Sequence, residues 1–94
     1  MIIETKFTYY SKYVYIPDGY IRDVEKIHLE RFSNWMRKQP DCFKETPNGM
    51  YYFTFDADVF LRYLNTEVLK NADEKAYFVE QPDGKKKIYS TLYF

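Results

Sequence analysis

Apolar and polar residues alternate along the first segment of the chain, from Ile2 to Ile16, and most of its residues are β-branched or aromatic. A period of two with this composition predicts a β-strand. The even positions carry the charges, so we expect the odd positions to face the core: Ile3, Phe7, Tyr9, Tyr13 and Tyr15. The segment is long for one strand, which predicts a bulge, a bend or a break at Ser11-Lys12.

A helical pattern follows, from Tyr20 to Lys38. Its apolar residues recur at about 100° per residue and therefore share one side of a helix; they are Ile21, Val24, Ile27, Phe32 and Trp35. Asp18 is the expected N-cap, because its carboxylate can accept the free amide protons of the first turn. Pro40 ends the helix, since the residue before a proline disfavours helical geometry.

The middle of the chain predicts a loop, a strand and a second helix. Residues Asp41–Gly49 contain the turn signal Pro-Asn-Gly and are expected to form a loop. Met50–Phe55 is almost entirely apolar, which is typical of a central strand covered on both faces. Asp56 or Asp58 is expected to cap a helix that runs to about Asn71 and carries a narrow apolar stripe.

Two further strands are predicted, over Lys75–Glu80 and Lys87–Phe94. Between them, Gln81-Pro82-Asp83-Gly84 is a turn signal, because proline presets one backbone dihedral and glycine accepts a positive one. The elements predict a single small α+β domain over residues 1–94, in the order β-α-β-α-β-β. We expect a four-stranded, mainly antiparallel sheet with two helices packed on one face.

Aromatic residues make up 21% of the chain, with 11 tyrosines and 8 phenylalanines, so the core must be rich in rings. Most of the tyrosines fall in predicted strands, and each hydroxyl needs a partner or water. Because helices cover only one face, alternation places Tyr10 and one of Tyr51 and Tyr52 on the other. Large exposed apolar patches usually mark interaction sites. We therefore expect this face to bind a partner, with homodimerisation as its simplest use.

The second helix offers a smaller exposed pair. Val59 and Tyr63 lie one turn apart on the side opposite the apolar stripe, with Lys70 nearby. Tyrosine contributes a large contact area from a stiff ring, although such pairs are also common on surfaces that bind nothing. The expected partner-binding residues combine these helix side chains with tyrosines of the predicted strands and with Lys86 near the last strand. They are Tyr10, Tyr52, Val59, Tyr63, Lys70, Lys86 and Tyr89.

The balance of charge lowers the odds of nucleic-acid binding. The chain has 14 basic and 14 acidic residues and no net charge, whereas binding driven by phosphates normally needs a basic excess. The cluster Lys85-Lys86-Lys87 beside Tyr89 and Tyr93 is the best contrary signal, because lysines hold phosphates and tyrosines stack on bases. Lysines on an edge strand also prevent unwanted strand pairing. The sequence therefore favours a protein partner and keeps nucleic acid as the alternative.

Catalytic signals are weak. His28, the only histidine, falls within the apolar stripe of the first helix, where a core imidazole is the ordinary explanation. Asp56-Ala57-Asp58 could hold a divalent cation, but its place at a helix start favours capping. Glycine-rich phosphate loops and Cys-x-x-Cys pairs are absent. We therefore expect no enzymatic activity, no metal and no cofactor.

The remaining sequence features concern location and class. Cys42 is the only cysteine, which fits a reducing cytoplasm, and neither a signal-peptide layout nor a membrane-spanning run is present. The sequence predicts a cytoplasmic, non-enzymatic protein-binding module that inhibits or regulates a larger partner. Small, neutral, motif-free domains are common among phage and mobile-element inhibitors of host defence, such as anti-CRISPR proteins. This association comes from size and missing motifs, not from particular residues.

Overall fold

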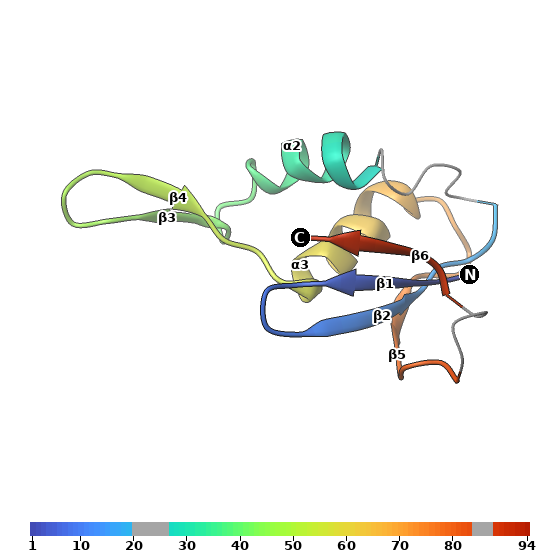
Figure 1. Cartoon of the computed structure of the whole chain (residues 1–94). Helices are drawn as coiled ribbons and strands as arrows, with labels where there is room; N and C mark the ends of the chain where they lie inside the picture. Colours follow the sequence, from blue (N-terminus) through green and yellow to red (C-terminus); the bar gives the residue numbers. More distant parts are fainter. Residues whose placement is uncertain (20–26, 84–87) are drawn as a thin grey trace.

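A four-stranded sheet forms the base of the domain in the computed structural model, which describes residues 1–19, 27–83 and 88–94 (Figure 1). Its strands are β1 (Ile2–Lys6), β2 (Ser11–Tyr15), β5 (Tyr77–Val79) and β6 (Ile88–Tyr93), in the spatial order β5-β2-β1-β6. β1 runs parallel to β6, while β2 is antiparallel to both β1 and β5. The α+β class and the four-stranded sheet are confirmed, but the sheet is mixed.

The long first strand of the sequence prediction is two strands. The amide of Phe7 donates to the carbonyl of Tyr10 at 2.8 Å, closing a turn between β1 and β2. This turn pairs Ile3 with Val14, so an odd and an even position share the core face. Tyr13 therefore lies on the opposite face from Ile3, contrary to the expectation. The break was expected, but the turn precedes Ser11 and reverses which parity faces inward.

Helical segments supply the other side of the core. η1 (Ile27–Phe32) continues into α2 (Ser33–Met36), and α3 (Ala57–Tyr63) continues into η2 (Leu64–Val68). Asp56 caps α3, because its Oδ1 accepts the amide of Val59 at 3.0 Å. The carboxylate of Asp18 pairs with the amino group of Met1 at 3.0 Å. The amides that Asp18 is predicted to cap lie outside the described residues, so its capping role stays a prediction.

Three predicted features lie outside the described residues. They are the start of the first helix at residues 20–26, Gly84 of the predicted turn, and the lysine cluster at residues 85–87. The backbone of His28 belongs to η1, but its side chain is also outside the described part, so the core-histidine prediction stays a prediction.

Aliphatic side chains and a cluster of aromatic rings pack together between the sheet and the helices. Ile3, Val14 and Leu92 from the sheet are fully or almost fully buried against Phe60 and Leu64 of the second helical segment. The rings of Phe60 and Tyr63 both pack on Phe32 of η1 in edge-on contacts, with centroids 5.1 and 5.5 Å away. Such T-shaped contacts bring the positive ring edge to the negative face of its neighbour. Among the described residues, Phe32, Phe60 and Tyr63 are the buried rings and the other buried apolar side chains are not aromatic, so the expected aromatic-heavy core is found only as this cluster.

A second, two-stranded sheet projects from the body (Figure 1). It consists of β3 (Phe43–Glu45) and β4 (Tyr51–Phe53), joined through a turn at Gly49, whose φ is +85°. The radius of gyration, 14.3 Å, exceeds the about 12 Å expected for a compact chain of this length. The prediction of a covered central strand at 50–55 is wrong. Its pairing partner is β3, within the segment expected to be a loop.

Candidate functional site

The β3–β4 hairpin, residues 43–53, carries three aromatic rings on one face, and we call it the aromatic ribbon. Phe43 lies opposite Phe53, and Tyr51 stacks on Phe43 with 5.6 Å between ring centroids and 27° between planes. Phe53 contacts both rings edge-on. Lys44 and Tyr52, also a cross-strand pair, occupy the other face. Over both faces, the exposed large side chains of the aromatic ribbon are Phe43 (42%), Met50 (67%), Tyr51 (67%) and Tyr52 (50%).

The outer edge of β4 offers backbone groups for pairing. The amides of Thr46 and Thr54 donate to the carbonyls of Met50 and Cys42, at 2.7 and 2.9 Å. Antiparallel strands alternate between bonded and non-bonded pairs, so the amide and carbonyl of Tyr51 and of Phe53 point away from β3. No other described strand pairs with β4. Such an edge can accept an additional strand.

The uncovered face of the main sheet carries polar contacts among its tyrosines. The Tyr13 hydroxyl donates to Oε2 of Glu4 at 3.2 Å, and the Thr91 hydroxyl donates to Oε1 of the same carboxylate at 3.1 Å. Burial, followed by the charge of Glu4, raises the pKa of the Tyr13 phenol. The Lys6 ammonium lies 5.7 Å from the ring centre of Tyr93, which is 70% exposed. This face is more polar than the aromatic ribbon.

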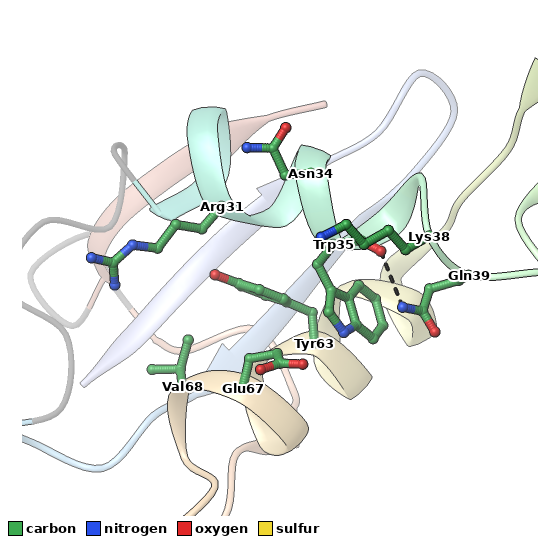
Figure 2. Close-up of a pocket in the computed structure, with 8 residues that line it drawn as sticks. All are labelled: Arg31, Asn34, Trp35, Lys38, Gln39, Tyr63, Glu67 and Val68. Carbon is green, nitrogen blue, oxygen red and sulfur yellow. Dashed lines mark hydrogen bonds between the residues drawn. The ribbon is translucent and has the colours of Figure 1, made fainter.

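A groove of about 700 Å³ lies between the first and second helical segments (Figure 2). One side is formed by η1, α2 and the residues that follow, and the other by α3 and η2. The side chains that line it are Arg31, Asn34, Trp35, Lys38, Gln39, Tyr63, Glu67 and Val68. A volume of this size is within the range of ligand pockets.

Trp35 is held in the groove by contacts on several sides. Its ring lies 5.5 Å from that of Tyr63, and the guanidinium of Arg62 lies 5.4 Å from its centre. Arg62 is fixed in turn by Asp41, whose two carboxylate oxygens accept hydrogen bonds at 3.1 and 3.0 Å. The side-chain amide of Gln39 donates to the backbone carbonyl of Trp35 at 3.0 Å. These contacts fix the aromatic surface before any ligand arrives.

Tyr63 is buried, and the expectation that it is exposed is wrong. Only 2% of its surface is accessible, because α3 packs on the sheet along one side and on Phe32 and Trp35 along another. Its hydroxyl forms no hydrogen bond with the described residues, although it borders the groove. Burial raises the pKa of this phenol, Arg31 lowers it and Glu67 raises it. The group is therefore protonated at neutral pH and able to donate.

The other residues predicted to bind a partner are dispersed. Tyr10 lies in the β1–β2 turn, where it stacks on Phe7 and its hydroxyl accepts the amide of Ala57. Tyr52 is on the aromatic ribbon, Val59 is half-buried against the core, and Lys70 is exposed. Tyr89 is 60% exposed and is skipped by the pairing register of β6, as expected of a bulge. Lys86 is outside the described residues.

The pattern of the sequence indicates neither the groove nor the β3 half of the ribbon. Trp35 was assigned to the core stripe, although it is only partly buried. Nothing in the pattern of the chain singles out Arg31 and Lys38. Pro47 and Gly49 predict a loop over Phe43, and Phe43-Lys44-Glu45 has no apolar and polar alternation that would indicate a strand.

Few groups suited to catalysis stand together. Within residues 1–19, 27–83 and 88–94, no three His, Cys, Asp or Glu side chains are placed to hold a metal. Asp56 is used as a helix cap and Asp58 is exposed. Cys42 is fully buried, and burial, followed by the charge of Asp41, raises the pKa of its thiol. No helix in the described part of the chain is long and apolar enough to cross a membrane.

Comparisons with protein families, with curated proteins and with solved structures find no match to this chain.

Proposed function

We propose that the protein is a non-enzymatic binding module that attaches to a larger protein through the aromatic ribbon. The supporting observation is the exposure of Phe43, Met50, Tyr51 and Tyr52 on a hairpin that extends from the body (Figure 1). Keeping these side chains in water forfeits the stabilisation that burial would give. Exposed apolar groups gathered in one place usually mark an interaction site, and tyrosines are frequent among the residues that dominate binding energy.

Two features of the ribbon suit it to protein recognition. The outward amides and carbonyls of Tyr51 and Phe53 can pair with a strand of the partner, which supplies affinity through main-chain hydrogen bonds. The stacked rings on one face, among them Phe43, can occupy apolar pockets of the same partner and supply specificity. A projecting hairpin with both features can enter a cleft and block it, which is the action of an inhibitor.

The narrower hypothesis is an inhibitor of host defence encoded by a phage or mobile element, acting in the cytoplasm. It rests on small size, zero net charge and missing motifs. The ribbon adds only a means of attachment, so the identity of the partner has to come from binding experiments.

The test compares two tyrosines that are both exposed but lie on different parts of the surface. Tyr51 is on the ribbon, whereas Tyr9 lies in the β1–β2 turn and is 95% exposed. In pull-downs from a bacterial lysate, we expect Tyr51→Ser to lose a protein that wild type and Tyr9→Ser both retain. With the purified partner, the loss of affinity should be at least about tenfold.

Two results would contradict the proposal. One is equal capture by all three proteins, which would remove the ribbon from the interface. The other is the absence of any captured protein together with turnover of a small molecule. A second copy of this chain is an alternative occupant of the ribbon, and a doubled mass in light scattering that Tyr52→Asp halves would identify it.

A nucleic-acid binder is the alternative function, and one observation favours it. Tyr93 is exposed beside the Lys6 ammonium, and such a pairing of ring and cation can stack on a base and hold a phosphate. The lysines at 85–87 lie outside the described residues and belong to this alternative on sequence grounds alone. Binding of single-stranded RNA or DNA that weakens steeply with added salt would support this function over the ribbon. The zero net charge of the chain argues against it.

A further inference from the structure

We propose that the groove between the two helical segments is a second binding site, which takes an acidic peptide segment with an apolar side chain between two carboxylates (Figure 2). The site is separate from the aromatic ribbon. Its test uses synthetic peptides, so either proposal can fail without the other.

The positive charges on one side of the groove indicate that its ligand is negatively charged. Arg31 and Lys38 both line it, with the amides of Asn34 and Gln39 near them. Neither cation forms an ion pair with the described residues, whereas nearby Arg62 is paired with Asp41. Arg31 and Lys38 are seven positions apart, or about 10 Å along a helix. Two carboxylates separated by a few residues of extended chain can reach both.

The middle of the groove indicates the apolar part of the ligand. Trp35 and Tyr63 lie between the two cations, with 5.5 Å between their ring centroids. The Arg62 guanidinium, which is paired with Asp41, contacts the Trp35 ring, so little side-chain freedom is lost when a ligand binds. An aromatic or aliphatic side chain can pack on these rings while its flanking carboxylates reach the cations.

The Tyr63 hydroxyl supplies the most specific contact. It is a donor on a residue that is 98% buried by accessible surface, and it has no hydrogen-bond partner among the described residues. Leaving such a group unpaired is costly, so it marks a position where an acceptor belongs. In Figure 2 the hydroxyl end of the ring lies on the side nearest Arg31. A carboxylate there can accept from the protonated phenol and pair with the guanidinium.

Glu67 narrows the choice among anionic ligands. It lines the side of the groove opposite α2 and also acts on Tyr63, whose pKa it raises. A continuous phosphodiester chain would bring negative charge against Glu67 as well as against the cations. A peptide with two separated carboxylates can keep both on the cationic side, so the structure favours it over nucleic acid.

The test uses Trp35 as its reporter, because it is the only tryptophan. The protein is titrated with acetyl-Glu-Ser-Phe-Ser-Glu-amide, in which alternation places the Glu and Phe side chains on one side of an extended chain. We expect a saturable change in tryptophan fluorescence. The analogue with Lys in place of Glu should give none, and the analogue with Ala in place of Phe should bind at least about threefold more weakly.

Variants assign the contacts. Arg31→Glu and Lys38→Glu should each weaken binding about tenfold or more. Tyr63→Phe, which removes only the hydroxyl, should weaken it about threefold to tenfold with no loss of thermal stability. Lys70→Glu is the control, because Lys70 is exposed and does not line the groove, and it should leave affinity unchanged. If Arg31→Glu fails to fold by circular dichroism, Arg31→Gln replaces it.

Three outcomes would overturn the proposal. They are the absence of a saturable signal, equal binding of the Lys and Glu peptides, and unchanged affinity in both charge-reversed variants. Tighter binding of a single-stranded oligonucleotide than of the acidic peptide would also reject it, in favour of nucleic acid.

Discussion

Phe7 and Phe94 stack face to face, with 4.7 Å between their ring centroids and 6° between their planes. Phe7 follows β1 and Phe94 follows β6, and the amide of Phe94 donates to the carbonyl of Lys6 at 2.8 Å. Phe94 also contacts the ring of Phe60 edge-on, at 5.1 Å. The stack therefore closes one end of the aromatic core and joins the two parallel strands to α3.

Replacing Phe94 tests this closure. We expect Phe94→Ala to lower the free energy of unfolding by about 2–3 kcal/mol, because the half-buried ring leaves a cavity among Phe7, Phe60 and their neighbours. Tyr93→Ala is the matched control, since Tyr93 is 70% exposed and should cost about 0.5 kcal/mol or less. Urea denaturation monitored by circular dichroism measures both. Equal losses of unfolding free energy in the two variants would show that the Phe7–Phe94 stack does not stabilise the fold.

The cap of α3 separates two neighbouring carboxylates. Asp56 accepts a hydrogen bond from the amide of Val59 at 3.0 Å. Asp58 lies in the first turn, where its charge interacts favourably with the helix dipole but caps no amide. Asp56→Ala should lower the free energy of unfolding by about 1 kcal/mol. Asp58→Ala should cost about 0.3 kcal/mol, and less in high salt. The same urea titrations measure both values. A larger loss of stability in Asp58→Ala than in Asp56→Ala would show that Asp58, and not Asp56, is the cap.

Cys42 provides a prediction about pH. Its thiol is fully buried, and both burial and the charge of Asp41 raise its pKa. The reactive thiolate is therefore scarcer in the folded protein than in an unfolded one at the same pH. In the native protein, reaction with a disulfide reagent should be slow at pH 8 and should accelerate at higher pH than for a free cysteine. Unfolding in urea should restore the ordinary rate. A native rate equal to the unfolded one would mean that Cys42 is exposed.

Part of the structure could be predicted from residues that are close together in the sequence. The capping carboxylate at Asp56 marks the start of α3, and the β-branched and aromatic residues of Ile88–Tyr93 form a strand as expected. These features depend on neighbours within a few residues, whose spacing is fixed by the chain itself. The aromatic content also indicated that rings would contribute to the core, as Phe32, Phe60 and Tyr63 do.

The candidate sites depended on contacts between distant residues. Periodicity predicts that Tyr63 lies on the exposed side of its helix, but the first helical segment covers that side through Phe32 and Trp35. The groove exists only because those two segments meet. Their side chains lie more than twenty positions apart in the sequence, so no local pattern could reveal the shared surface.

By itself, the sequence determined the α+β class and a helix start capped at Asp56 or Asp58, because each follows from composition or from short-range geometry. Tertiary structure decided which faces were left over. A turn at Phe7–Tyr10 reversed the parity of β2, and pairing with Phe43–Glu45 took β4 out of the main sheet. The physical reason is that alternation fixes which side chains share a face within one strand. It does not fix which strand will pair with it or what will cover that face.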